Sequence, residues 1–387
     1  MRTTLRLIVP GLIDPVPYIK ELPAQDLPEL PVFSNFLSRG KYISPETCDT
    51  TNNNLYTCIL DQFPLQTHFH QLPIASLSYC FDFKRRDFKS RDLKNEGNDS
   101  EDLLPLEALK DKWLMRLDPC FMVPDRDQLV LAQIENFDIS LQESEQLVEE
   151  INQFFNDFKE DNFWTIKVVS AERWYLVSDR PIDIETVPPE KVIGQSVKSY
   201  LLCANTKESR YWLNLFNEFQ MILHQSPINK LRGENNKVPI NSLWFWGQDR
   251  NSELLNSFFY KGNVAGDVLL YADNIIVQGL ALVSGGDCSS VPDNYSLISN
   301  AHEKNVICIL DDFSRVIQNK DIFSWVALLE QFEKNYLHDI LKDLDAGKLF
   351  QLELLSPTGR RLIVTKKLLR RWWRKKKNFT SFYNNNS

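Results

Sequence analysis

The sequence has few of the residues that build metal and disulfide sites. Its 387 residues include five histidines and seven cysteines, and no Cys-x-x-Cys pair occurs. An odd number of unpaired cysteines is typical of reduced thiols in a cytosol, so we expect a cytoplasmic protein without zinc sites of paired cysteines. No apolar run approaches the roughly 20 residues that span a bilayer. Glycine (13) and proline (19) are too few for a low-complexity chain.

Charge is distributed unevenly along the chain. The 44 basic and 52 acidic residues give a net charge of −8, yet residues 360–377 (RRLIVTKKLLRRWWRKKK) contain ten basic residues and no acidic one. Without this stretch, 34 basic residues remain against 52 acidic ones, a net charge of −18. Because a body this acidic repels phosphates, we expect no binding of nucleic acid by most of the chain.

Apolar periodicity predicts both strands and helices. Ser140 and Glu143 form a capping box at the start of the clearest helix, residues 138–159. We read residues 84–102 as an exposed loop and 226–241 as a polar loop. The order strand, helix, strand over 263–310 favours a partly parallel sheet. The other expected strands are 5–9, 75–82, 129–134, 165–170 and 173–178, the other helices are 209–224 and 321–344, and a hairpin is expected over 350–365.

Candidates for catalysis are scarce. No nucleophile elbow GxSxG and no phosphate-binding GxxxxGK[ST] or GxGxxG loop occurs. His68 and His70 would share one face of a strand, but a metal site needs a third ligand, so a polar loop is the simpler interpretation. Asp311 and Asp312 follow a buried strand pattern. They are crevice candidates at the carboxyl end of that strand, although capping of the next helix is our preferred interpretation.

The most specific signal is an aromatic motif. Residues 241–248 (NSLWFWGQ), with Asn229 and Arg232 upstream, resemble a motif of the archaeal-type cofactor-independent phosphoglycerate mutases of the alkaline-phosphatase superfamily. The segments LRLIVPGL (5–12) and 30–40 extend this resemblance. A bacterial offshoot of this family, described as RpfE-type regulatory proteins, has a similar order of segments. In this chain they are WLMRLDP, DRDQL, Arg173-Trp174-Tyr175 and the aromatic motif. The motif residues, structural or ligand-facing, are Arg173, Asn229, Arg232, Asn241, Trp244, Trp246, Gly247 and Gln248.

The resemblance implies a fold and a domain organisation. We expect an α/β protein with an alkaline-phosphatase-like core and a mixed, mainly parallel sheet, formed by residues 1–112 and 240–387. An inserted α+β cap would occupy residues 113–239.

The resemblance also implies a chemistry whose residues are missing from the expected positions. The superfamily uses two divalent metals and a phosphorylated Ser or Thr nucleophile. Pro10 stands where the resemblance places a ligand Asp, and residues 180–190, 305–315 and 350–365 lack the expected histidines. We therefore expect no catalytic residue, no metal ligand and no cofactor, but a regulatory protein with an unknown protein partner. The alternative is an active mutase or phosphohydrolase with non-standard ligands, which would use a divalent metal.

The basic tail allows three interpretations. A helix over 366–377 would gather Leu368, Leu369 and two tryptophans on one side, as in a peripheral membrane helix. The same stretch could bind nucleic-acid phosphates, which we consider unlikely. It could also fold back onto the acidic body, with the tryptophans completing the core. The tail residues concerned are Lys366, Lys367, Arg370, Arg371, Trp372, Trp373 and Arg374.

Overall fold

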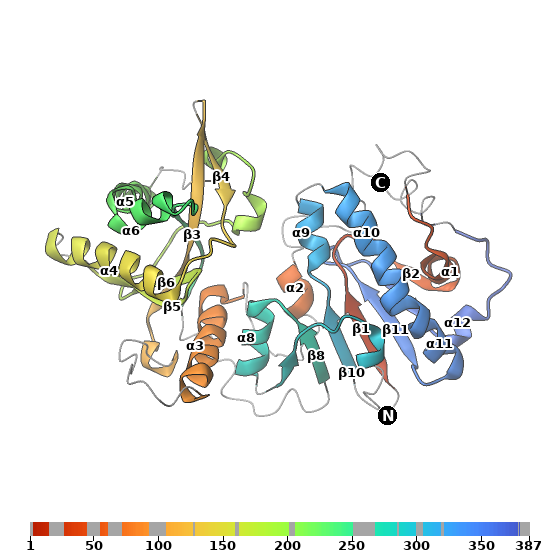
Figure 1. The fold of residues 1–387 in the computed structure, drawn as a ribbon. Helices are drawn as coiled ribbons and strands as arrows, with labels where there is room; N and C mark the ends of the chain where they lie inside the picture. Colours follow the sequence, from red (N-terminus) through yellow and green to blue (C-terminus); the bar gives the residue numbers. More distant parts are fainter. Residues whose placement is uncertain are drawn as a thin grey trace. The chain divides into compact units, whose positions relative to one another are not determined.

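The computed structural model divides the chain into two compact units, Met1–Leu72 with Lys261–Ser387 and Pro73–Tyr260. Figure 1 shows the elements of both. The residues that the structure describes are 3–14, 27–44, 55–60, 72–92, 106–126, 128–158, 162–200, 206–250, 268–284, 286–298, 305–318, 321–377 and 379. His68 and His70 lie outside them.

The first unit contains a mainly parallel sheet with the strand order β2-β12-β11-β1-β10-β8-β9. Strand β1 is central and runs parallel to both β10 and β11, while β12 is antiparallel to β11. This confirms the expected mixed α/β class with a mainly parallel sheet. The strands are β1 (Thr4–Ile8), β2 (Lys41–Ile43), β8 (Val268–Ala272), β9 (Cys288–Ser289), β10 (Asn305–Ile309), β11 (Gln351–Leu355) and β12 (Arg361–Val364).

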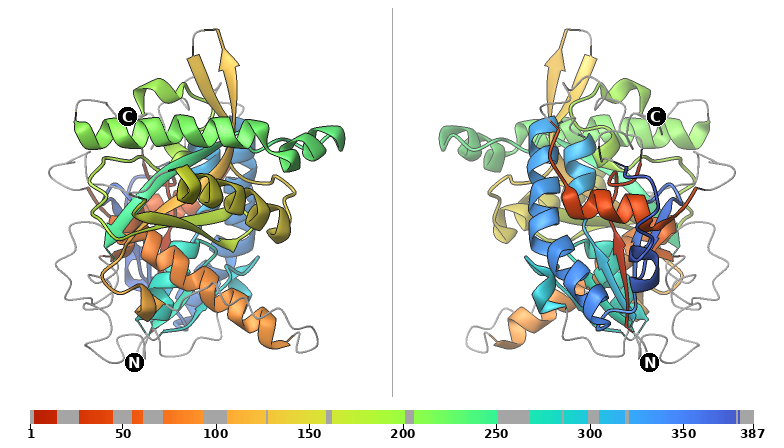
Figure 2. Two further views of the ribbon diagram at one scale, coloured as in Figure 1. Left: turned by 90° about the vertical axis from the view of Figure 1, so that its left-hand side faces the viewer. Right: turned by 90° about the vertical axis from the view of Figure 1, so that its right-hand side faces the viewer.

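Helices of the first unit bury apolar side chains against this sheet. The predicted helix over 321–344 is present as α10, a π-helical segment Glu333–Leu337 and α11, and the right-hand view of Figure 2 shows α1 beside it. Buried Glu333 caps α1, because its carboxylate accepts hydrogen bonds from the backbone N–H of Val32 (2.6 Å) and Phe33 (3.1 Å). The helices are α1 (Pro31–Arg39), α2 (Leu55–Leu60), α8 (Ile275–Val283), α9 (Asp312–Gln318), α10 (Ile322–Phe332), α11 (His338–Ala346) and α12 (Lys366–Leu369).

The basic tail folds back onto the first unit, but not as expected. Helix α12 ends at Leu369, so the predicted helix over 366–377 is wrong beyond that residue. Trp372 and Trp373 are exposed and complete no core. Phe379 does so instead, with its ring 5.7 Å from that of Phe33 and 6.0 Å from that of Trp325. Phenylalanine has no polar atom that needs a partner, whereas each indole N–H does, which suits Phe379 to an apolar pocket.

The second unit is built on an antiparallel sheet. Strand β3 pairs with β6 on one side and β7 on the other, and its far end pairs with β4. Helix α3 contacts β7, β3 and β5, and the left-hand view of Figure 2 shows it with α4 and α5. The elements are β3 (Trp113–Asp125), β4 (Gln128–Gln133), β5 (Trp164–Ser170), β6 (Arg173–Ser178), β7 (Ser242–Arg250), α3 (Ile74–Asp92), α4 (Leu141–Phe158), α5 (Lys207–Gln225) and α6 (Pro227–Glu234).

Helix α3 corrects two predictions. The expected strand over 75–82 is its first half, and the expected loop over 84–102 is helical as far as Asp92. Small residues at Ala75, Ser76 and Ser78 are fully buried along with Leu77 and Tyr79, so the apolar alternation does not mark two sheet faces. The Ser78 hydroxyl donates to the Ile74 carbonyl one turn back, which satisfies it inside a helix. The expected polar loop after α5 likewise contains α6.

The unit boundaries differ from the expected ones at 112/113 and 239/240. They fall at 72/73 and 260/261, because α3 and β7 pack with the β3–β6 sheet. Among the described residues, no helix has the length and apolarity needed to cross a membrane. Cysteines 120, 288 and 308 are free thiols, and burial raises the pKa of Cys288 to about 11.

Candidate functional site

The carboxyl ends of β1, β8, β10 and β11 share one edge of the first unit's sheet. In open parallel sheets, ligands bind at this edge, so the polar residues that follow these strands form the candidate site. We call them the carboxyl-edge residues: Asp14 after β1, Asp273 and Asn274 after β8, Asp311 after β10, and Ser356, Thr358 and Arg360 after β11.

Asp14 is buried and ties two of these strand ends together. Its Oδ2 accepts a hydrogen bond from the backbone N–H of Gly11 at 2.9 Å. Its Oδ1 accepts hydrogen bonds from the hydroxyls of Ser356 and Thr358, both at short range. Gly11 makes this turn with φ of 73°, a conformation that glycine adopts without strain. The carboxylate therefore accepts three hydrogen bonds from its own surroundings.

A second contact joins the ends of β8 and β10. The Asn274 amide donates to Asp311 Oδ2 at 3.1 Å, while Asn274 Oδ1 accepts from the backbone N–H groups of Ile276 and Val277 at the start of α8. Asp311 is half-buried beside this contact, and Asp312 is exposed in the first turn of α9. Whether either carboxylate contacts a ligand stays a prediction.

Arg360 adds positive charge to the same edge. The guanidinium nitrogens Nε and Nη1 are buried, and neither has a hydrogen-bond partner among the residues that the structure describes. Its backbone carbonyl accepts from the N–H of Ser356 at 2.9 Å, which closes the β11–β12 turn next to the two hydroxyls. A buried donor without a partner costs free energy, and an anionic ligand would relieve that cost.

The described residues at this edge do not fit the two-metal site that the resemblance implies. Pro10 has no side-chain ligand atom, and Asp14 already accepts three hydrogen bonds. Over the part of the chain that the structure describes, no group of three or more His, Cys, Asp or Glu side chains could hold a metal ion.

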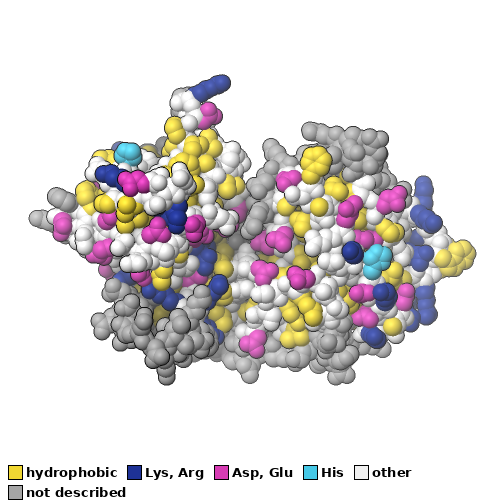
Figure 3. Space-filling model, in the orientation of Figure 1, with side chains coloured by type: hydrophobic (Ala, Val, Ile, Leu, Met, Phe, Trp, Pro, Cys, Tyr) yellow, Lys and Arg dark blue, Asp and Glu magenta, His cyan; other side chains and the backbone are white. Residues whose placement is uncertain are grey.

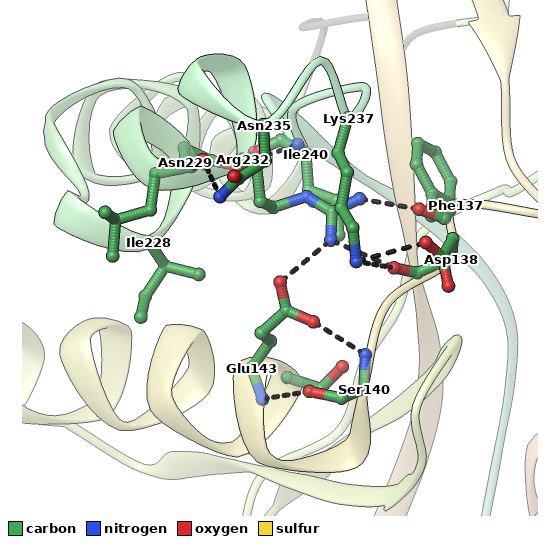
Figure 4. A network of polar contacts seen from close by, with 12 residues as sticks. Phe137, Asp138, Ser140, Glu143, Ile228, Asn229, Arg232, Asn235, Lys237 and Ile240 are labelled. Carbon is green, nitrogen blue, oxygen red and sulfur yellow. Dashed lines mark hydrogen bonds and ion pairs between the residues drawn. The ribbon is translucent and has the colours of Figure 1, made fainter.

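The motif residues lie in the second unit, where they bind other parts of the protein. Figure 4 shows Asn229 and Arg232 of α6 beside the start of α4. Arg232 is 1% exposed and donates to Glu143 Oε1 at 3.1 Å and to the Phe137 carbonyl at 2.7 Å. Asn229 donates to the carbonyls of Leu223 and Ile240 and accepts from the N–H of Ile240. Both side chains therefore form hydrogen bonds with backbone groups of the second unit.

Three further motif residues, Asn241, Gly247 and Gln248, are also engaged in contacts within the protein. Asn241 accepts from Met122 N–H and donates to the carbonyl of the same residue, both at 2.8 Å. Gln248 donates to the Ile184 carbonyl and accepts from the Thr186 hydroxyl. Gly247 has φ of 67°, and an added Cβ would come within 2.7 Å of the side chain of Ile74. A side chain at this position is therefore excluded by conformation and by space.

The two tryptophans of the motif differ in surroundings. Trp246 is buried and donates its indole N–H to Asp118 Oδ2 at 2.6 Å. The Arg116 guanidinium lies 4.5 Å from the Trp246 ring centre and binds Asp118 through two nitrogens. Trp244 donates to the Val187 carbonyl and lines a small pocket with Glu185, Thr186, Tyr200, Leu213, Phe216 and Phe245.

Arg173 belongs to a second buried charge cluster. It pairs with Asp82 of α3 through two nitrogens at 2.7 and 2.8 Å, and the Tyr175 hydroxyl donates to the same carboxylate. Burial lowers the pKa of Arg173, but the bonds and charge of Asp82 outweigh this effect and leave the pKa above its ordinary value. Burial raises the pKa of Tyr175, and Asp82 adds to the rise. Arg173 thus stays charged and Tyr175 neutral at neutral pH.

Sequence reasoning missed both the carboxyl-edge hydroxyls and the partners of the charge clusters. Asp14 lies four residues after Pro10, so a search that allowed for a longer turn would have found it. Asp118 lies inside the quoted segment WLMRLDP, and its position two residues after Arg116 on a strand places both side chains on one face. Asp82 carries no such signal, because the sequence pattern predicts a strand over 75–82 where the structure has α3.

Comparisons with known proteins agree with the class that this fold and motif indicate. A family model described as 2,3-bisphosphoglycerate-independent phosphoglycerate mutase matches residues 107–229. A protein of Geobacter sulfurreducens named "Probable 2,3-bisphosphoglycerate-independent phosphoglycerate mutase" is 27% identical over 190 residues, 49% of this chain and 46% of that protein. A protein of Methanosarcina barkeri with the same name, without "Probable", is 23% identical over 175 residues, 45% and 42% of the two chains.

The resemblance to the cofactor-independent phosphoglycerate mutases is thereby confirmed, with the matched segment mainly in the second unit. This chain spans less than half the length of the curated relatives it matches. The narrower likeness to RpfE-type proteins stays a prediction.

Two solved structures align over most of the chain at low similarity. A cofactor-independent phosphoglycerate mutase from Thermoplasma acidophilum has a TM-score of 0.40 at 14% identity and covers 99% of this chain and 97% of its own. The PH0037 protein from Pyrococcus horikoshii has a TM-score of 0.41 at 13% identity, with 94% and 87% covered. Scores this low carry no argument about the function.

Proposed function

We propose that this chain is a phosphoglycerate-mutase-like protein that acts in the cytoplasm of a bacterium as a regulatory, partner-binding protein, without the two-metal phosphoryl transfer of the superfamily. One observation carries the proposal. At the end of β1, where the resemblance places a ligand carboxylate, the chain has Pro10, and the nearby Asp14 accepts hydrogen bonds from Gly11, Ser356 and Thr358.

Physical chemistry supports this assignment. A carboxylate that coordinates a metal must present free lone pairs to it, and the metal then lowers the pKa of the nucleophile. Asp14 would have to give up contacts with two hydroxyls and one N–H before it could do so. The side chains of the motif, which are similar to those of the mutases, are bound to the protein's own backbone and charges.

The test is a metal and turnover assay on the full chain. We expect less than one equivalent of tightly bound metal after incubation with Mn²⁺, Zn²⁺, Co²⁺ or Mg²⁺, and no conversion of 3-phosphoglycerate into 2-phosphoglycerate. The Methanosarcina barkeri relative serves as the positive control. Expression of the chain is also expected not to restore growth to cells that lack phosphoglycerate mutase.

Two bound metals together with turnover that disappears in Asp14→Asn or Asp311→Asn would contradict the proposal. The variant Asp312→Asn is the matched control, because this carboxylate is exposed beside the same strand end. An equal loss in all three variants would indicate a general effect of charge on folding, which thermal unfolding of the variants would reveal.

A second candidate function rests on Arg360 and the hydroxyls. Ser356 and Thr358 each donate to the Asp14 carboxylate, and the buried Arg360 guanidinium follows in the same turn. A hydroxyl bonded to a carboxylate near a cation is an arrangement that can bind a phosphoryl group and, in the enzyme alternative, accept it.

This alternative predicts that inorganic phosphate or 3-phosphoglycerate raises the melting temperature of the native chain and not that of Arg360→Ala. The control is Arg361→Ala, because Arg361 is exposed on the adjacent strand. Phosphate transfer to Ser356 or Thr358, detected by mass spectrometry, would favour the enzyme over the regulatory protein. No shift with either ligand would remove the candidate.

A further inference from the structure

An exposed loop of the first unit is held at both ends. We define the basic loop as residues 370–377, between buried Leu369 and buried Phe379. Arg39 donates to the Leu369 carbonyl at 2.7 Å, and the Lys377 N–H donates to the Ser38 hydroxyl at 2.8 Å. Helix α1 therefore fixes both ends of the loop and leaves its middle outside the core.

The middle of this loop presents two indole rings to solvent. Trp372 is 80% and Trp373 is 67% exposed, and their ring centres lie 6.1 Å apart at an angle of 85°. Two large adjacent apolar side chains are costly to leave in water, so such a pair indicates a contact surface. Figure 3 shows an apolar protrusion at the right-hand edge, with Lys and Arg side chains beside it.

Six cations surround the indoles. Arg370 and Arg371 precede them, and Arg374, Lys375, Lys376 and Lys377 follow. None of the six forms an ion pair with another residue of the described part of the chain. All but Arg371 are exposed. Apart from one hydrogen bond of Arg374 Nη1 to the Gly40 carbonyl at 3.2 Å, the positive charge is therefore available to an external anionic surface. The chain outside the loop has 38 basic and 52 acidic residues, a net charge of −14.

We propose that the basic loop docks this protein on the surface of a bilayer that contains anionic lipid. Tryptophan rings prefer the interface between headgroups and acyl chains, where the ring is in apolar surroundings and the N–H remains hydrated. Lysine and arginine on both sides of the rings would contact the anionic headgroups. The protein would lie on the membrane rather than span it.

The geometry favours a membrane over a nucleic acid. Successive bases of a single strand stack with parallel planes, and an aromatic platform for them presents its ring faces in the same direction. The Trp372 and Trp373 rings are nearly perpendicular, so they cannot both stack on neighbouring bases. A lipid interface imposes no such alignment, and anchoring by α1 means that little ordering is needed on binding.

The experiment is cosedimentation of the full chain with vesicles. Vesicles of phosphatidylcholine with about 30 mol% phosphatidylglycerol should bind the protein, and pure phosphatidylcholine should not. The double variant Trp372→Ala/Trp373→Ala and the triple variant Lys375→Glu/Lys376→Glu/Lys377→Glu should each weaken partitioning at least about tenfold. Brominated lipid should quench tryptophan fluorescence in the native chain and much less in the double variant.

Two matched controls separate the loop from general effects. Phe323→Ala removes another aromatic ring of the first unit that is 88% exposed. Lys191→Glu/Lys207→Glu/Lys230→Glu reverses three exposed lysines of the second unit and changes the net charge by the same amount. Both should bind vesicles like the native chain. Because the loop side chains are exposed, all variants should keep the native melting temperature.

Binding that survives both loop variants, or no binding to anionic vesicles at low salt, would overturn the proposal. A single-stranded oligonucleotide is the competing probe in the same assay. If it binds more tightly than the vesicles and the double tryptophan variant abolishes that binding, the loop is a nucleic-acid site instead.

Discussion

The two units place their charged groups differently. In the second unit, Arg116, Asp118, Asp82 and Arg232 are buried inside the packing of sheet and helices. In the first unit, the described core is mainly apolar, and its buried carboxylates are Glu333, which caps α1, and Asp14 at the carboxyl edge of the sheet. The basic loop adds a cluster of exposed cations.

This difference distinguishes residues that stabilise the fold from residues that are free to bind a ligand. The motif that is similar to the mutases lies in the second unit and is saturated by internal contacts. The carboxyl edge and the basic loop carry less specific sequence signals. Over the described residues, however, Arg360 Nε and Nη1 have no hydrogen-bond partner and the loop cations form no ion pair. The aromatic motif and the two groups of residues proposed to bind ligands therefore lie in different units.

The largest expected effect tests the buried charges of the second unit. Asp118→Ala would leave the Arg116 guanidinium buried without its counter-charge and should lower the free energy of unfolding by about 3–5 kcal/mol. Tryptophan fluorescence in urea reports the loss, because six of the nine tryptophans lie in residues 73–260. The solvent-exposed ion pair of Lys112 with Asp179 provides the control. Asp179→Ala removes the partner of Lys112 and should lower the free energy of unfolding by less than about 1 kcal/mol.

The double variant Arg116→Met/Asp118→Leu sharpens this test. Replacement of both charges by apolar side chains should recover most of the loss, since desolvation of the pair offsets much of its attraction. If the double variant were as unstable as Asp118→Ala, the two side chains would stabilise the fold through contacts other than their mutual charge compensation.

A smaller effect is expected from the apolar core of the first unit. Phe379→Ala would empty the space between Phe33 and Trp325 and should cost about 3 kcal/mol. Hydrogen exchange of the α1 amides measures it locally. Trp372→Ala, in the same segment but exposed, should leave this exchange unchanged. Equal protection in both variants would show that Phe379 does not anchor the segment.

The smallest effect concerns pH in the second unit. Burial acts to raise the pKa of Glu143, but hydrogen bonds from Ser140 and the contact with Arg232 outweigh it, so the pKa lies below its ordinary value. A depressed pKa means that the folded state prefers the carboxylate, and the resulting stability is complete above the ordinary pKa and disappears as pH falls through the folded value.

Glu143→Gln should therefore cost about 1 kcal/mol at neutral pH and progressively less below about pH 4.5. Urea titrations across this range give the difference between native and variant. Glu145→Gln, on the same helix and more exposed, is the control. A difference that stays constant down to pH 3 would mean that the charge of Glu143 plays no part.

Local signals in the sequence predicted local structure well. Ser140 and Glu143 exchange the two hydrogen bonds of a capping box at 3.1 and 2.8 Å, as their spacing indicates. Strands β5 and β6 and helices α4 and α5 lie within a few residues of the predicted ranges, and β8, α8 and β10 follow the predicted order strand, helix, strand over 263–310. The apolar period of β5, α4 and α5 matches one buried face, and the continuous apolar runs of β6 and β10 are buried on both faces. Tertiary packing therefore agrees with the local pattern.

The failures arise where tertiary structure overrides the local pattern. Helix α3 is buried around Ala75–Tyr79, so burial there does not follow a helical period. The tail pattern predicts a helix over residues 366–377, but α1 holds Phe379 and Leu369 and the chain between them turns. The bonds of Asp14 join residues more than 340 positions apart, which no window of sequence can reveal.

The pairing of β1 has a consequence for how the protein is made. Both neighbours of β1, strands β10 and β11, follow it by about 300 residues or more, and both pairings are parallel. Residues 73–260 leave the ribosome as a continuous block and can fold while synthesis proceeds. Residues 4–8 must wait, as an unpaired apolar strand, for many seconds at ordinary elongation rates. Co-expression of a ribosome-associated chaperone that binds this unpaired strand should therefore raise the soluble yield of the whole chain. The yield of residues 73–260 expressed alone should rise less.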